Sequence, residues 1–324
     1  MHSSLAAVVS VCILGSVATA CSAQGYPQHT LWSQATARVN PAASANLYSL
    51  DFLGVFRRQW LDIEGSPTTS TLSLAAPIYI VNSGAAFSYQ RDGAGATDVT
   101  TLRGSLAYGL VRGEEFGVSV GAGVSYRTAS LNGRELRTET GDYTGGVFDH
   151  QDNLLPLNTV SASGIGVDVG VEFSYRESRL GFAVQDVNQP AIDWQTAART
   201  WPATYLAYAT TVVPLAERLD LDAGVLAQSD ATVTQVQVNA LFWYDGNIGA
   251  GGAFRGYSAN SVDAASVLLA WRPSGTVTLV YAYDYGLSGL SNAHSGSHEI
   301  GLRYEMANPI GKGKLPPVIF NPRL

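Results

Sequence analysis

The chain has 324 residues and a formal net charge of −7, which argues against a nucleic-acid partner. Charged residues make up 14% of the chain, against about 25% in typical soluble domains. No long apolar run follows the N-terminal region, and this excludes a helical membrane protein. A transmembrane β-barrel remains compatible with the sequence, because it distributes its hydrophobicity as an alternation along each strand.

The N-terminal residues 1–23 read as an export signal. The stretch from Leu5 to Ala20 is apolar, and small residues follow it, so we expect a secretory signal peptide cleaved after Ala23. Cys21 leaves a second possibility open, processing as a lipoprotein. Both cysteines, Cys12 and Cys21, lie in this region, so we expect a mature chain without a disulfide or thiol chemistry.

The mature chain divides into three predicted parts. Residues 24–46 are polar and contain Asn40-Pro41-Ala42, and we expect them to form an N-terminal periplasmic segment. Strand patterns fill residues 47–306, which we expect to form the barrel. The proline-containing residues 307–324 are expected to form a periplasmic C-terminal tail.

The clearest strand runs from Ile165 to Arg176. Every second residue in it is apolar, and the residues between are small or charged, including Asp168 and Glu172. Side chains alternate faces along a strand, so the segment has one apolar and one polar face. Its length fits a strand that crosses a bilayer in about 9–11 tilted residues. Residues 116–127 repeat the pattern, with glycine and serine on the polar face.

Connection lengths separate a membrane barrel from a soluble sandwich. We count about fourteen strands, and the odd-numbered connections are the longer ones, near 59–67, 92–99, 129–159, 187–201, 229–233, 258–262 and 287–296. Most even-numbered connections are tight, at 112–115, 177–179, 214–217, 245–247 and 273–275. Bacterial outer-membrane barrels have short periplasmic turns and longer extracellular loops. We therefore predict an all-β, antiparallel up-and-down barrel, integral to the outer membrane and in contact with the lipid bilayer.

Charged residues on the polar faces of these strands are expected to lie in the lumen. They could line an ion pore, or they could pair with one another and pack the lumen shut. We favour pairing, because both signs occur and an unpaired charge in a narrow lumen is costly. The predicted lumen charges are Arg103, Arg127, Asp168, Glu172, Arg176, Arg255, Asp284, Glu299 and Arg303.

Other candidate site residues lie in or beside the longer connections. Trp60, Trp194 and Trp201 are either interfacial girdle residues or anchors for a protein partner, and the sequence does not separate the two. The cluster from His294 to Glu299 could suggest a metal site or a Ser–His hydrolase. We expect instead a loop that leads into the last strand, because no third ligand or orienting carboxylate has a recognisable spacing. No catalytic residue, metal or cofactor is predicted.

The segment from Tyr281 to Tyr304 resembles the PorP/SprF family of Bacteroidota outer-membrane proteins. The resemblance covers nearly the whole mature chain, and the order and spacing of its motifs make it specific. The other matching motifs are Asn40-Pro41-Ala42, Arg58-Gln59-Trp60, Gly65-Ser66-Pro67-Thr68-Thr69, Gly181-Phe182-Ala183-Val184 before Asn188-Gln189-Pro190, and the run from Gly249 to Arg255.

This resemblance implies a non-enzymatic barrel of the type IX secretion system, linked in some organisms to gliding motility. The implied partners are secreted cell-surface proteins, notably those with a type-B sorting domain, and other secretion or cell-envelope components. We expect the external loops, chiefly 129–159 and 187–201, to receive or anchor the cargo. The alternative function is a passive outer-membrane channel or a small-hydrophobe transporter.

Overall fold

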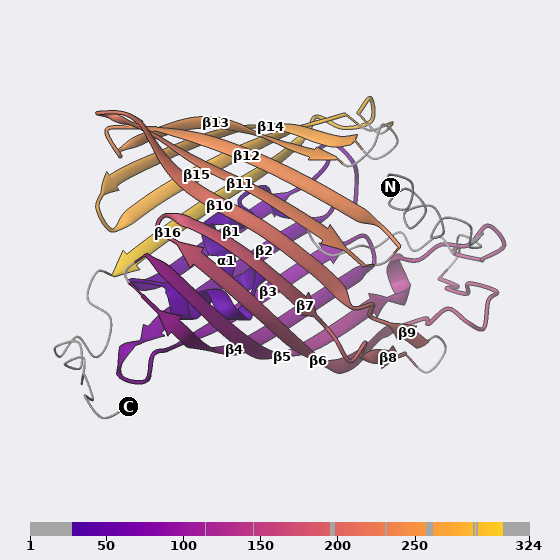
Figure 1. The fold of residues 1–324 in the computed structure, drawn as a ribbon. Helices are drawn as coiled ribbons and strands as arrows, with labels where there is room; N and C mark the ends of the chain where they lie inside the picture. Colours follow the sequence, from indigo (N-terminus) through magenta and orange to yellow (C-terminus); the bar gives the residue numbers. More distant parts are fainter. Residues whose placement is uncertain are drawn as a thin grey trace, which may run out of the picture.

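Fourteen antiparallel strands close into a barrel in the computed structural model (Figure 1), which confirms the predicted architecture and strand number. The structure describes residues 28–306, apart from 114, 145, 195–197, 231, 257–261, 288 and 290. The predicted signal peptide, residues 1–23, and the predicted tail, residues 307–324, lie outside the described residues.

The barrel strands follow one another in chain order around the wall. The first seven are β1 (Leu50–Arg58), β2 (Thr68–Ile78), β3 (Ser83–Ala94), β4 (Thr97–Arg112), β5 (Phe116–Asn132), β6 (Thr159–Tyr175) and β7 (Ser178–Gln185). The other seven are β10 (Thr204–Ala216), β11 (Leu219–Ser229), β12 (Thr234–Tyr244), β13 (Ile248–Gly256), β14 (Val262–Ser274), β15 (Val277–Gly286) and β16 (Ser297–Met306). Antiparallel pairing of β1 with β16 closes the wall. The short strands β8 (Ala191–Asp193) and β9 (Ala198–Thr200) form a separate sheet.

The two ends of the barrel differ in the length of their connections (Figure 1). At the turn end the strands are joined by residues 79–82, 113–115, 176–177, 217–218, 245–247 and 275–276. At the loop end they are joined by residues 59–67, 95–96, 133–158, 186–203, 230–233 and 287–296, while the connection between β13 and β14 lies outside the described residues. The 3₁₀ helix η3 (Tyr79–Val81) lies in a turn, and η4 (Gly133–Glu135) begins the longest loop. The longer connection predicted near 92–99 is wrong, because Ala94 pairs with Thr97 across a two-residue hairpin.

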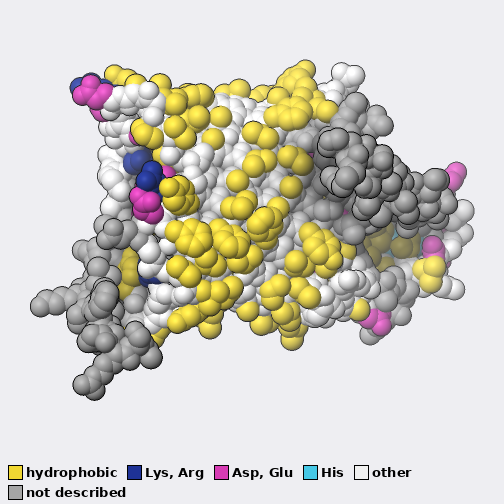
Figure 2. Space-filling view, in the orientation of Figure 1, with side chains coloured by type: hydrophobic (Ala, Val, Ile, Leu, Met, Phe, Trp, Pro, Cys, Tyr) yellow, Lys and Arg dark blue, Asp and Glu magenta, His cyan; other side chains and the backbone are white. Residues whose placement is uncertain are grey.

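Apolar side chains cover the middle of the outer wall in Figure 2, and charged side chains gather at its ends. Strand β6 shows how the sequence produces this surface. Ile165, Val167 and Val169 are exposed on the outside, whereas Asp168 and Glu172 are buried. Alternation of faces therefore places the apolar residues where lipid would contact them, and the carboxylates inside.

The barrel interior is filled by residues 28–47, which we call the plug. It contains η1 (Trp32–Ala35), α1 (Thr36–Val39) and η2 (Pro41–Asn46), and most of its residues are buried. We expected residues 24–46 outside the barrel, as a periplasmic segment, but the described part of that segment lies within the lumen. Small and apolar residues such as Ala42 and Ala43 explain this, because their side chains pack without needing water. Within the described ranges, no helix is both long and apolar enough to cross a membrane.

Candidate functional site

The plug consists of short helical turns because capping residues and a proline in its sequence end each turn after a few residues. Asn40 ends α1 and caps η2, with its side-chain oxygen accepting a hydrogen bond from Ala42 N at 3.0 Å. Pro41 takes the first position of η2, where a helix needs no N–H donor. Asn40 also donates from Nδ2 to the carbonyl oxygen of Val171 at 2.9 Å, which ties this cap to the barrel wall.

The plug runs along the lumen from the loop end to the turn end. Near its start, Thr30 N donates to Glu299 Oε2 at 2.8 Å, close to the loop end of β16. Near its finish, Asn46 Nδ2 donates to Glu172 Oε1 at 2.8 Å, close to the turn end of β6. The segment therefore occupies most of the length of the barrel before it turns into β1.

Glycines on the inner wall make room for the plug. Gly84 on β3, Gly121 on β5 and Gly170 on β6 face η2 and its cap. A Cβ atom at any of the three would collide with the backbone of η2 or with the Asn40 side chain. A glycine in a strand interior often marks such a close approach of another backbone.

Five buried residues hold the start of the plug, and we call them the latch. Arg57 donates to Glu299 at 2.8 Å and to Asp284 at 2.7 Å. The Thr30 hydroxyl donates to Asp284 at 2.9 Å and accepts from Arg255 Nη2 at 2.7 Å. Two guanidinium groups face two carboxylates, so the buried charges balance.

A second group of lumen charges lies between β4, β5 and β6. Arg103 Nε pairs with Asp168 at 2.5 Å, and Arg127 Nη2 pairs with Asp186 at 2.8 Å. Asp186 N donates to Asp168 Oδ1 at 2.9 Å, which joins the two ion pairs. Both carboxylates therefore have protein partners inside the wall.

The remaining lumen charges, Glu172 and Arg303, lie toward the turn end of the barrel. Buried Glu172 accepts a short hydrogen bond from Tyr208 Oη, in addition to the bond from Asn46. Arg303 pairs with Asp51 at 2.8 Å across the β1–β16 seam. Eight of the nine predicted lumen charges thus lie inside the barrel, and their partners are other protein groups.

Arg176 is the exception, and its placement in the lumen was wrong. Strand β6 ends at Tyr175, and Arg176 lies in the following turn with a φ of 51°. Its side chain is exposed and pairs with Glu115 at 2.7 Å, in the neighbouring turn. The alternation rule fails here because the residue no longer belongs to the strand.

The three tryptophans are half-buried, and contacts within the chain occupy their rings. Trp60 lies with its ring centroid 6.4 Å from that of His294. The Trp194 Nε1 donates to a β5 carbonyl oxygen at 3.0 Å. The guanidinium of Arg127 lies 4.7 Å from the ring centroid of Trp201.

The cluster between His294 and Glu299 does not assemble a catalytic pair. Ser297 and His298 are adjacent in β16, so they point to opposite faces of the wall. Ser297 is buried, and His298 Nδ1 shares a hydrogen bond with Tyr281 Oη at 2.6 Å. Within the described part of the chain, no three His, Cys, Asp or Glu side chains are grouped as metal ligands.

Several functional groups of the lumen were missed by sequence reasoning. Strand β1 carried a usable signal, because outward Phe52 and Phe56 imply that Asp51 and Arg57 face inward. Thr30 carried none, since the plug has no strand periodicity. The missed residues are Thr30, Arg38, Asp51, Arg57, Asp186 and Tyr208.

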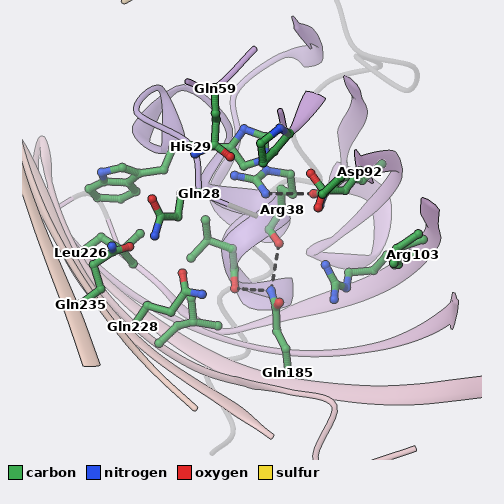
Figure 3. Close-up of a pocket in the computed structure, with 18 of the residues that line it drawn as sticks. Gln28, His29, Arg38, Gln59, Asp92, Arg103, Gln185, Leu226, Gln228 and Gln235 are labelled. Carbon is green, nitrogen blue, oxygen red and sulfur yellow. Dashed lines mark hydrogen bonds between the residues drawn. The ribbon is translucent and has the colours of Figure 1, made fainter. Parts of the chain in front are cut away.

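A cavity of about 390 Å³ lies above the plug, among residues from the loop-end halves of the strands (Figure 3). We call it the loop-end cavity. Its floor includes His29, Trp32 and Arg38 of the plug, and its walls include Gln59 and Gln228. Seven glutamines, three arginines and one aspartate line it, so carboxamide and guanidinium groups dominate its chemistry.

The longest loop, residues 133–158, has a small core of its own. His150 is fully buried, with Nδ1 2.9 Å from Tyr143 Oη, and its ring packs edge-on to Phe148. The guanidinium of Arg137 lies over the rings of Tyr143 and Phe148, at 4.7 and 5.1 Å. Contacts within the chain therefore preorganise this loop for binding a partner.

The outer surface of this loop combines apolar and acidic groups. Val147, Leu154 and Leu157 are exposed. Hydrogen bonds from the backbone N–H and the hydroxyl of Thr144 lower the pKa of the Asp142 carboxyl, which stays ionised. Exposed apolar side chains on an ordered loop are typical of a protein-binding surface.

Solved structures with a similar fold are outer-membrane barrels. The monoaromatic hydrocarbon channel CymD is 13% identical, with a TM-score of 0.51 over 87% of this chain and 94% of that chain. The Ralstonia pickettii toluene transporter TbuX is 11% identical, with a TM-score of 0.47 over 84% and 93% of the two chains. The Pseudomonas putida toluene transporter TodX is 9% identical, with a TM-score of 0.47 over 85% and 93%. At these identities the likeness concerns the fold alone.

The family of the chain is shown by a match to a protein-family model. Among curated proteins no relative matches this chain. The model described as type IX secretion system membrane protein PorP/SprF matches residues 21–304, which include every barrel strand except the last two residues of β16. A barrel with an apolar outer belt and the fold of outer-membrane proteins agrees with that description. The chain therefore belongs to the PorP/SprF family of type IX secretion system membrane proteins, and it is an outer-membrane β-barrel.

Proposed function

We propose that this barrel receives or anchors secreted cell-surface proteins at its loop end and acts without catalysis. The observation that carries the proposal is the filled lumen. The plug runs from Thr30 beside Glu299 to Asn46 beside Glu172, and buried ion pairs surround it. Such a barrel is suited to holding a partner at its mouth, whereas a passive channel needs a continuous aqueous path.

The partner surface that we propose is the external side of the loops. Residues 133–158 form an ordered loop with exposed Val147, Leu154 and Leu157, and the rigid aromatic core beneath them lowers the entropy lost on binding. The paired strands β8 and β9, within the connection 186–203, add a second structured element at the same end. The type-B sorting domain of the cargo and the link to gliding motility remain predictions from the family resemblance.

The proposal is tested by isolating the complete protein from solubilised outer membranes. A secreted surface protein should co-purify with it, and replacing residues 137–152 by a short Gly-Ser linker should abolish that association. The matched control replaces the turn at residues 245–247, at the opposite end, and should leave it unchanged. Recovery of no secreted protein, or equal recovery with both variants, would refute the proposal.

Conductance in planar bilayers separates this function from the channel alternative. The intact protein should give no stable open pore, because the plug fills the lumen between the two ends. A persistent open conductance in the wild-type protein would favour a passive channel. Uptake of small aromatic compounds that depends on this protein would favour a transporter.

A further inference from the structure

We propose that the loop-end cavity binds an extended peptide segment of the partner that presents a carboxylate, and that Arg38 is the group that receives the carboxylate. This inference rests on the proposed function, since it names the chemistry by which the barrel holds its cargo. It adds a site inside the barrel mouth to the external loops described above.

The first support is the electrostatic state of Arg38. Its guanidinium has five N–H donors, and within the described residues its hydrogen bonding consists of one long contact, from Nη1 to Gln90 Oε1 at 3.4 Å. The other two arginines of the cavity differ, because Arg103 pairs with Asp168 and Arg127 pairs with Asp186. Arg38 is thus a half-buried cation that forms no direct ion pair with a described carboxylate, and a planar guanidinium matches a carboxylate in two parallel hydrogen bonds.

The second support is a pair of uncommitted carboxamides. The side chains of Gln59, the residue that follows β1, and Gln228, from β11, line the same cavity as Arg38 (Figure 3). Neither carboxamide makes a hydrogen bond to another described residue. A carboxamide offers one acceptor and two donors, which is the complement of a peptide group.

The plug contributes a further unused hydrogen-bonding atom, on the side chain of His29. His29 lines the cavity and is buried, and its Nε2 atom has no hydrogen-bond partner among the described residues. A buried nitrogen without a partner is costly, and a ligand that reached it would remove that cost. Four side chains with unused hydrogen-bonding capacity therefore surround one space of about 390 Å³, within the range of ligand sites.

The aromatic groups favour a peptide over an oligosaccharide. Sugar sites commonly offer an open aromatic face on which a ring can stack. Here Arg127 covers a face of Trp201, at 4.7 Å, and Trp32 is buried against Tyr208 with ring centroids 6.0 Å apart. The third ring of the lining, that of Trp60, is half-buried, with its centroid 6.4 Å from that of His294. The recognition groups left are a guanidinium and carboxamides, which suit main-chain amides and a carboxylate.

The test uses the full-length protein in detergent and fluorescence anisotropy of labelled octapeptide pools of mixed composition. One pool has a free terminal carboxylate and no acidic side chains. A second has an amidated terminus and one internal glutamate, and a third is amidated and neutral. We expect at least one of the two acidic pools to bind about ten- to a hundred-fold more tightly than the neutral pool, and the pool that does so identifies the source of the carboxylate.

Variants then assign the site. Arg38→Gln should remove the preference for the acidic pool, whereas Arg176→Gln, an exposed arginine at the turn end, should keep it. Gln228→Ala should weaken all pools several-fold and leave the preference intact. Equal binding of acidic and neutral pools by the wild-type protein would overturn the proposal without any variant. Loss of the preference only in the Arg176 variant, or stronger binding of an oligogalacturonate than of every peptide pool, would also overturn it.

These outcomes are separable from those of the co-purification experiment. If a secreted protein co-purifies through the loop 133–158 but no acidic pool is preferred, the peptide site fails and the proposed function stands. If an acidic pool is preferred but no secreted protein co-purifies, the proposed function fails while the cavity remains a peptide site.

Discussion

The latch predicts that a single substitution, Arg57→Met, will open the barrel. Methionine keeps much of the length of the side chain and removes the charge that faces both Asp284 and Glu299, at 2.7 and 2.8 Å. Removing one partner of a buried ion pair commonly costs about 3–5 kcal/mol, because the other charge stays buried. The plug start at Thr30 should then leave its site more often.

The structure places the expected cost near the lower end of that range. After the substitution Glu299 still accepts from Thr30 N at 2.8 Å and Leu31 N at 3.2 Å, and Asp284 keeps Arg255 at 3.4 Å. We therefore expect about 3 kcal/mol, which raises the population with an undocked plug by roughly a hundred-fold. Transient openings should appear in single-channel recordings of the variant, whereas we expect the wild-type protein to be silent.

Arg58→Met is the matched control, because Arg58 is the next residue of β1 and faces outward, exposed. It should leave both the recordings and the urea unfolding midpoint in micelles close to wild type. An Arg57→Met protein that still shows the heat-modifiable mobility of a folded barrel, yet stays silent and keeps its midpoint, would refute the assignment of the latch.

Three further changes test other parts of the structure. Gly121→Leu should expel η2 from the inner wall and produce openings as well, whereas Gly104→Leu, where a Cβ meets nothing within 4 Å, should not; equal recordings from both would contradict the glycine contact. Arg176→Ala should change the unfolding free energy by less than about 0.5 kcal/mol, since exposed ion pairs contribute little, and a loss of several kcal/mol would show that the turn has a structural role. His150→Ala should expose the loop 133–158 to limited proteolysis while the barrel stays intact; unchanged resistance would mean that the aromatic core does not hold the loop.

The barrel itself could be predicted because its information is periodic. The side chains from Ile165 to Tyr175 alternate between the outer surface and the lumen, so the two-residue periodicity predicts both the strand and the inward position of Asp168. The same count explains the error at Arg176, since periodicity does not mark where a strand stops. The hairpin at 95–96 was missed for the opposite reason, because β3 and β4 continue beyond the apolar belt with polar residues.

The plug could not be predicted, because tertiary contacts determine its place. Residues 28–47 carry no repeat of period two, and their short turns would look the same in a linker. Their position depends on wall glycines such as Gly84 and Gly170, which are distant in sequence, and on pairs such as Thr30 with Glu299. The cavity depends on the plug in turn, so Arg38 could not be recognised as a site residue beforehand.

The path of the plug constrains how the protein can be assembled and labelled. Residues 28–47 lead directly into β1, and β1 is one of the two strands that meet at the closing seam with β16. Filling the lumen after the seam had closed would require the segment to thread from one mouth of the barrel to the other. Closure of the wall around a segment that is already in place avoids this threading, and we expect assembly to follow that order. A folded reporter domain fused directly ahead of Gln28 would have to be accommodated at the loop end during that wrapping, so a small epitope in a turn such as 245–247 is the safer label.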